Sequence, residues 1–100
     1  MLLLTKALRK QLPKLGATEH IPCEEKTLVV KFFTPDSNWT WWAVEFDGED
    51  TFFGLVDGFE REWGNFSLAE LQSARGRLGL PIERDLYFQP CKFKDLKMAV

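Results

Sequence analysis

Seven carboxylates are the side chains of this sequence whose type and number could support chemistry if the fold brought them together. They occupy turns and strands of the predicted structure: Asp36, Glu45, Asp57, Glu60, Glu62, Glu83 and Asp85. Two or three carboxylates around Mg²⁺ would support a metal-dependent hydrolase or nuclease. Their spacing is not diagnostic of any metal site, and acidic side chains are ordinary at turns and on exposed strand faces. We therefore expect no metal site and keep the hydrolase as an alternative.

Covalent catalysis has less support, because it requires a nucleophile, a base and a group that orients the base. His20 is the only histidine, and it lies in a predicted loop. Cys23 and Cys91 follow neither zinc-ligand nor redox spacing. The seven glycines are scattered at turns and caps and form no phosphate-binding loop. The sequence favours a non-enzymatic protein without a cofactor over an enzyme.

Arg84 alternates with apolar residues in a predicted strand, so it points toward the apolar side if that strand is regular. A buried guanidinium requires a carboxylate, because an unpaired buried charge is costly. Glu45 and Asp57 are the expected partners. The pair is either an ion pair that specifies the fold or part of an anion-binding cleft.

Four tryptophans invite a nucleic-acid interpretation, because bases stack on aromatic faces. Alternation of side chains from Trp39 onward predicts a strand with two distinct faces. Nucleic-acid sites also need basic residues among the aromatics, whereas the neighbours here are acidic. We expect core packing for at least two tryptophans, and partner binding for whichever lies on the less covered face. The predicted faces are Thr40, Trp42, Val44 and Phe46 on one side, and Trp39, Trp41, Ala43 and Glu45 on the other.

Length and composition predict one domain over residues 1–100, with 45% hydrophobic and 14% aromatic residues. The net charge of −2 gives no general attraction to phosphates or anionic lipid. No apolar run reaches the length of a membrane span, so we expect a cytoplasmic protein without a membrane contact. Basic residues cluster at the two ends of the chain, at Lys6, Arg9, Lys10 and Lys14 and at Lys92, Lys94 and Lys97. These clusters keep nucleic-acid binding as an alternative to protein binding.

Periodicity and turn signals predict an α+β domain in the order helix, four strands, helix, strand. Two helices pack on or beside an antiparallel sheet of about five strands. Asp57-Gly58 predicts a hairpin turn with positive φ at both central residues, and Gly76 is the predicted C-terminal residue of the second helix. The predicted elements are a helix at 5–12, strands at 27–33, 39–46, 51–56 and 59–66, a helix of about nine residues from Ser67, and a strand at 82–88.

Three runs of residues, in this order, resemble one bacterial family of small single-domain proteins. The first is Phe33-Thr34-Pro35-Asp36 with Thr40-Trp41 and Glu45, the second is Phe53-Gly54-Leu55 with Asp57, Glu62, Gly64 and Ser67-Leu68-Ala69-Glu70-Leu71, and the third is residues 78–88. The chain is similar to the domain of unknown function numbered twenty-nine fifty-eight. The resemblance implies association with plasmids and other mobile genetic elements, near anti-restriction and replication functions, and it implies no activity.

The leading hypothesis is a non-enzymatic accessory protein of mobile elements that binds another protein in a defence, anti-defence or plasmid-maintenance context. Nucleic-acid binding through the basic first helix and C-terminal tail is the first alternative, and a metal-dependent hydrolase or nuclease is the second. The oligomeric state stays open. We expect the polar turn at 36–38 to lie beside Glu45 and residues 83–85. The candidate binding residues are Asp36, Asn38, Trp41, Glu45, Asp57, Glu83, Arg84 and Asp85.

Overall fold

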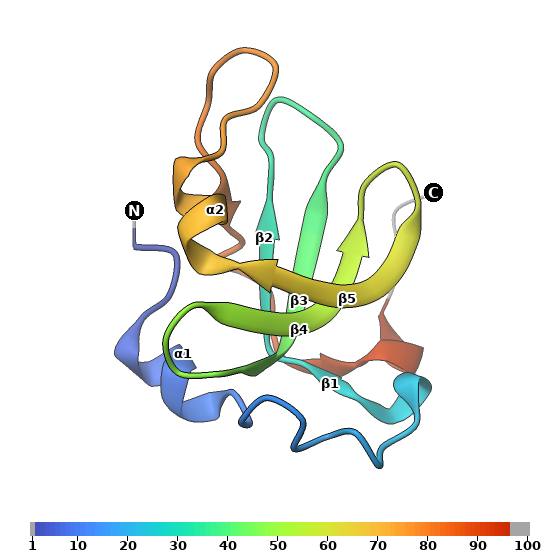
Figure 1. Cartoon of the computed structure of the whole chain (residues 1–100). Coiled ribbons are helices and arrows are strands. Elements are labelled where there is room, and N and C mark those ends of the chain that lie inside the picture. Colours follow the sequence, from blue (N-terminus) through green and yellow to red (C-terminus); the bar gives the residue numbers. More distant parts are fainter. Residues whose placement is uncertain (1, 97–100) are drawn as a thin grey trace.

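The computed structural model describes residues 2–96 and contains a five-stranded antiparallel sheet with a two-stranded sheet beside it (Figure 1). The strand order of the large sheet is β5-β4-β3-β2-β6. The predicted α+β class and the five-stranded sheet are confirmed. The elements are α1 (Lys6–Gln11), η1 (Cys23–Glu25), β1 (Thr27–Leu28), β2 (Val30–Phe33), β3 (Thr40–Phe46), β4 (Thr51–Asp57), β5 (Arg61–Ser67), α2 (Leu68–Ser73), β6 (Glu83–Arg84), β7 (Cys91–Lys92) and η2 (Phe93–Asp95).

The predicted strand at 27–33 is divided between the two sheets. β1 pairs with β7, whereas β2 lies between β3 and β6. Val29 is the residue between β1 and β2. Its backbone N–H donates to the carbonyl of Ala43 at 2.8 Å, so it is still hydrogen-bonded to β3 of the large sheet. The last predicted strand, at 82–88, is much shorter than expected: only β6 pairs with β2, and the chain then turns to form β7.

Both helices begin at the residues that the sequence predicts. The side chain of Thr5 accepts a hydrogen bond from the N–H of Leu8, and the side chain of Ser67 accepts one from the N–H of Glu70. The second helix is shorter than predicted. It ends at Ser73, and the capping residue Ala74 already has an extended backbone, so the assignment of Gly76 as its C-terminal residue is wrong.

The hairpin between β4 and β5 also differs from its prediction. Asp57 pairs with Arg61, which leaves three residues in the loop, and the N–H of Gly58 donates to the carbonyl of Glu60. Neither Asp57 nor Gly58 has positive φ, so the predicted two-residue turn is wrong. Gly58 is required for another reason: a Cβ there would lie 2.3 Å from the ring of Trp39.

A β-bulge in β3 changes the predicted alternation. Ala43 pairs with Gly54, and Glu45 is the next residue to pair, with Phe53, so one residue of β3 has no partner in β4. Phe46 therefore packs in the same core cluster as Ala43, and not with Val44. Glu45 faces away from Trp41, although strict alternation puts them together.

Each face of the large sheet carries its own hydrophobic cluster. One cluster joins the sheet to both helices and to the N-terminal segment, through residues such as Phe32, Phe52 and Leu71. The other cluster lies between the sheet and the C-terminal segment and includes Leu28, Trp42 and Leu55, with Phe93 packed against them. Ile82, just before β6, belongs to the first cluster, whereas the other residues of the loops at the end of the sheet opposite α1 (Figure 1) belong to neither.

Candidate functional site

Three loops meet at one end of the sheet and form a surface that we call the loop end (Figure 1). They are residues 34–39 between β2 and β3, residues 58–60 between β4 and β5, and residues 75–82 between α2 and β6. Trp39 joins the first two loops. Its ring stacks on that of Trp41 with centroids 5.9 Å apart, and it meets the ring of Phe59 edge to face at 5.2 Å.

Asp36 joins the first loop to the third. Its Oδ2 accepts hydrogen bonds from the N–H of Leu78 at 2.7 Å and from the N–H of Leu80 at 3.2 Å. Its Oδ1 is buried against Gly76, where a Cβ would lie 1.5 Å from that oxygen. A bend also closes the third loop on itself, since Gly76 and Leu80 share a backbone hydrogen bond of 2.9 Å. The three loops are therefore fixed relative to one another.

Hydrogen bonds between Thr34 and Trp39 also close the first loop. The N–H of Thr34 donates to the carbonyl of Trp39 at 3.0 Å, and the hydroxyl of Thr34 accepts from the N–H of Trp39 at 3.0 Å. Asn38 lies exposed on this loop. The loop thus holds the Trp39 ring in place without help from a ligand.

A groove of about 400 Å³ runs between the tryptophans and the third loop. Its lining residues are Thr34, Ser37, Trp39, Trp41, Ala74, Arg75, Gly76, Arg77 and Ile82. Two arginines are the only charged residues among them. The guanidinium of Arg75 donates to the carbonyls of Gln72 and Ala74 at the end of α2, and Arg77 is exposed.

Large apolar side chains lie exposed on the loops around this groove. Phe59 is 94% exposed and Leu78 is 82% exposed. A phenylalanine at the tip of a three-residue loop contributes almost nothing to the core, so its exposure has no explanation in folding. Exposed aromatic and aliphatic side chains next to arginines are the composition of protein-binding hot spots.

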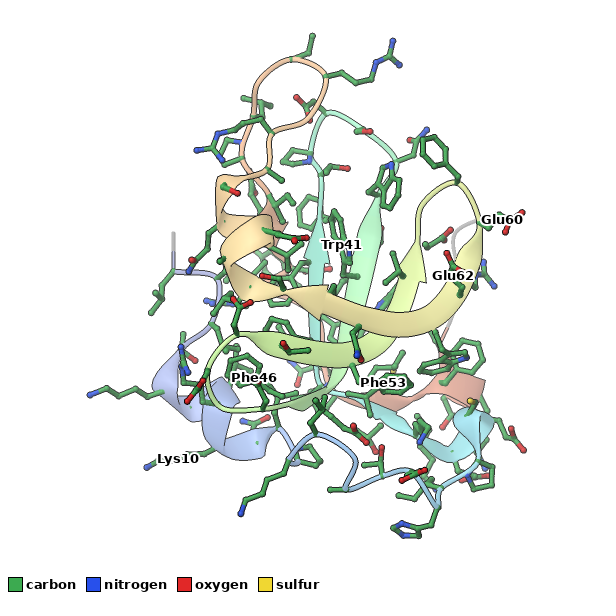
Figure 2. All side chains as sticks on the ribbon, viewed as in Figure 1. Lys10, Trp41, Phe46, Phe53, Glu60 and Glu62 are labelled. Atoms are coloured by element: carbon green, nitrogen blue, oxygen red, sulfur yellow. The ribbon has the colours of Figure 1, made fainter. Side chains whose placement is uncertain are left out.

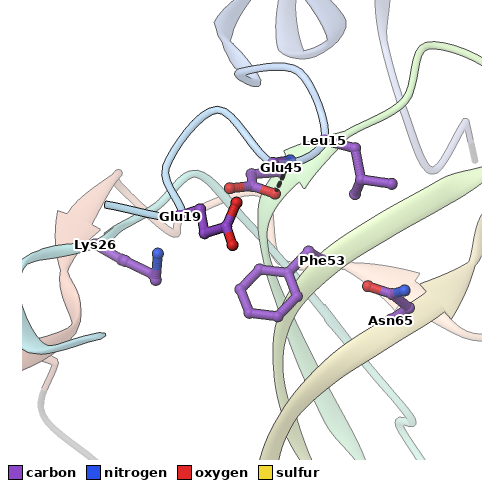
Figure 3. A pocket seen from close by; sticks show the side chains of 7 residues that line it. Leu15, Glu19, Lys26, Glu45, Phe53 and Asn65 are labelled. Atoms are coloured by element: carbon purple, nitrogen blue, oxygen red, sulfur yellow. Dashed lines mark hydrogen bonds between the residues drawn. The ribbon is translucent and has the colours of Figure 1, made fainter. Parts of the chain in front are cut away.

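Glu45 lies elsewhere, beneath the segment of residues 13–26, which we call the strap (Figure 3). It is only 3% exposed, and its carboxylate accepts from the N–H of Gly16 at 2.6 Å, from the N–H of Thr18 at 2.9 Å and from the hydroxyl of Thr18. Lys26, which is also buried, donates to the carbonyl and hydroxyl of Thr18. Burial opposes ionisation of Glu45, but these hydrogen bonds and the charge of Lys26 lower its pKa below the ordinary value.

The pocket beside Glu45 has a volume of about 340 Å³ and lies between the strap and β4 and β5. Phe53, Asn65, Leu15 and Glu19 face it (Figure 3). The buried oxygens of Glu45 are already used by the strap. We therefore interpret this carboxylate as the anchor that holds the strap against the sheet, and not as a ligand-binding group.

Residues 83–85 form a third location, at the β6 edge of the sheet. Asp85 makes a half-exposed ion pair with Lys31 at 3.5 Å and accepts from the N–H of Tyr87. The guanidinium of Arg84 is half-buried and donates to the backbone carbonyls of Leu2 and Leu3, which fixes the N-terminal segment. Glu83 pairs with Phe33 across the strands.

The family model described as Protein of unknown function (DUF2958) matches residues 3–94, which include every residue of the loop end. The chain belongs to this family. No curated protein and no solved structure matches it. This is the family that the three runs of residues resemble. Its description assigns no activity.

The structure separates the eight predicted site residues into three places. Asp36, Asn38 and Trp41 lie at the loop end, and Asp57, paired with Arg61 at 3.9 Å, lies at the base of its hairpin. The 34–39 loop ends where β3 begins, at Thr40. Glu45 lies five residues further along β3, which is about 16 Å from Thr40 at the usual rise of a strand. The expected meeting of the 36–38 turn with Glu45 therefore does not occur, and Glu45 and Asp57 have partners other than Arg84.

The structure also bears on the basic residues of the nucleic-acid alternative and on the carboxylates of the hydrolase alternative. Lys92 and Lys94 both bind the carboxylate of Glu25, at 2.9 and 2.8 Å, and they lower its pKa to about 2. Lys97 lies outside the described residues. Within residues 2–96, no three His, Cys, Asp or Glu side chains are grouped so that they could hold a metal ion, and no helix is long and apolar enough to cross a membrane.

Sequence reasoning missed most of the loop end. Arg75, Arg77, Leu78 and Phe59 were not identified, and Trp39 was identified only as one of four tryptophans. One local signal was available: a phenylalanine follows the Asp57-Gly58 turn directly, close to the tip of the hairpin. The contact between the loops has no such signal, because it joins residues about forty positions apart.

Proposed function

We propose that this protein is a non-enzymatic protein-binding module that uses the loop end to contact its partner. The observation that supports this most strongly is the exposure of Phe59 and Leu78 on loops held together by Trp39 and Asp36. Apolar groups in this number on a fixed surface favour association with another protein, because water is released from both surfaces.

The rigidity of the loops supports the same proposal. A flexible loop loses conformational entropy when it binds, whereas a loop fixed in advance does not. Asp36 and Thr34 fix the loops through backbone hydrogen bonds, and Gly76 and Gly58 provide the space for close packing. The polar turn at 36–38 thus supports binding indirectly, because it positions the apolar side chains of the neighbouring loops.

The setting of the proposal comes from the family resemblance. We propose a cytoplasmic accessory protein of plasmids or other mobile genetic elements, whose partner belongs to host defence, anti-defence or plasmid maintenance. The three separate locations of the candidate carboxylates favour a binding role over a hydrolase.

Affinity capture with matched variants tests the proposal. The protein, the double variant Phe59→Ser/Leu78→Ser and the control Tyr87→Ser are immobilised and exposed to candidate restriction, defence and plasmid-maintenance proteins. Tyr87 is 92% exposed but lies after β6, outside the loop end. We expect a partner that the protein and the Tyr87 variant retain and that the double variant loses. Turnover of a substrate, or a partner that all three bind equally, would contradict the proposal.

A further inference from the structure

We infer that the groove between the tryptophans and the third loop binds an acidic, apolar segment of the partner protein. The inference rests on the proposed function, because it assumes that the loop end contacts a protein. It adds the chemistry of that protein: a carboxylate that meets the arginines, next to an apolar side chain that lies on the indole rings.

The walls of the groove provide the apolar part. Trp39 and Trp41 form one wall with their stacked rings, and Ile82 and Ala74 lie among the other lining residues. The volume of about 400 Å³ suits one or two side chains of a peptide. Phe59 extends this surface beyond the groove, since its ring contacts Trp39.

The charges of the groove provide the acidic preference. Arg75 and Arg77 line it, and no carboxylate does. Asp36 is close, but its oxygens face the third loop and Gly76. Within residues 2–96, Arg77 makes neither a hydrogen bond nor an ion pair. An arginine beside an aromatic wall binds a carboxylate through two parallel N–H groups while the apolar neighbour packs on the ring.

A peptide fits this surface better than a nucleic acid does. Glu60 and Glu62 belong to the neighbouring hairpin and extend on the side away from the third loop (Figure 2). A strand of regularly spaced phosphates that continued from the groove past Trp39 and Phe59 would meet these carboxylates, at a protein whose net charge is −2. A peptide can place its carboxylates at the arginines alone and its apolar groups toward Phe59.

Titration with defined peptides tests the inference. The first probe is a fluorescein-labelled peptide in which glutamates alternate with leucine and phenylalanine, and the second replaces every glutamate by lysine. The third is a single-stranded oligothymidylate. Anisotropy measures binding of each to the full chain. We expect the acidic peptide to bind at least about tenfold more tightly than the basic one, with a difference that falls as salt rises.

Charge reversal makes the result independent of folding defects. Arg77→Glu should remove most of the preference, and Arg75→Glu/Arg77→Glu should invert it, so that the double variant gains affinity for the basic peptide. Circular dichroism of each variant shows whether the fold is kept, so that a gain of affinity in a folded variant reports on the groove. Equal binding of both peptides, binding of neither, or tighter binding of the oligothymidylate would overturn the inference. If one of these results is obtained but the Phe59→Ser/Leu78→Ser variant still loses the partner protein, the proposed protein-binding function stands and the acidic-peptide inference is wrong.

Discussion

The carboxylate of Asp36 occupies the space where a side chain at Gly76 would begin. A Cβ at position 76 would lie 1.5 Å from Oδ1, while Oδ2 accepts from the N–H of Leu78 at 2.7 Å. The side chain of Asp36 thus joins two loops that are far apart in the sequence, and it can do so because Gly76 has no side chain. The arrangement of the loop end depends on this contact.

Gly76→Ala should push Asp36 out of its place and loosen the third loop. Overpacking of this kind costs about 1–3 kcal/mol in unfolding free energy. Hydrogen exchange at the amides of Leu78 and Leu80 should become faster, because their acceptor is displaced. Gly64→Ala is the matched control, since nothing lies within 4 Å of a Cβ at that position. Unchanged exchange in the Gly76 variant would show that Asp36 does not hold the loop.

Phe59→Ala should separate binding from stability. The side chain is 94% exposed, so its loss should change the unfolding free energy by no more than about 0.5 kcal/mol. Gly58→Ala, one residue earlier, should cost more, because its Cβ would collide with the ring of Trp39. Urea unfolding followed by circular dichroism measures both. A large loss of stability in the Phe59 variant would assign this ring to the fold and not to a partner.

Glu45→Gln should release the strap. The amide keeps one acceptor oxygen but turns its NH₂ group toward N–H donors that the carboxylate now satisfies. A buried group left without its partner costs about 1–3 kcal/mol. Glu19→Gln is the control, because that carboxylate is exposed beside the same pocket. Equal stability of the two variants in urea would contradict the role of Glu45 as the anchor.

The same carboxylate predicts the response to acid. The folded chain holds the pKa of Glu45 below its ordinary value of 4.5, so the stabilisation is fully present above that value. It is lost as the pH falls through the lower, folded pKa. Unfolding free energy measured between neutral pH and pH 3 should therefore fall more steeply in the natural chain than in Glu45→Gln. Parallel curves would show that the ionisation of Glu45 does not contribute.

Local patterns in the sequence predicted the elements better than they predicted the site. Thr5 and Ser67 begin their helices as expected, because a cap involves neighbours along the chain. Glu45 was placed on the wrong face, because a bulge in β3 depends on its pairing with β4 and not on residue types. Gly76 was taken for a helix end for a similar reason. The glycine is needed where a distant carboxylate approaches it, and such an approach leaves no mark on nearby residues.

Photo-crosslinking inside cells tests the central claim most directly, because it captures whichever protein contacts the chosen position. A benzophenone amino acid is placed at position 59 in one variant and at position 87 in another, both of which replace exposed aromatic residues. After irradiation, we predict a discrete adduct of higher mass from position 59, absent from position 87 and reduced by Gly76→Ala. The absence of an adduct from position 59, or the same adduct from both positions, would contradict the assignment of the loop end as the partner-binding surface.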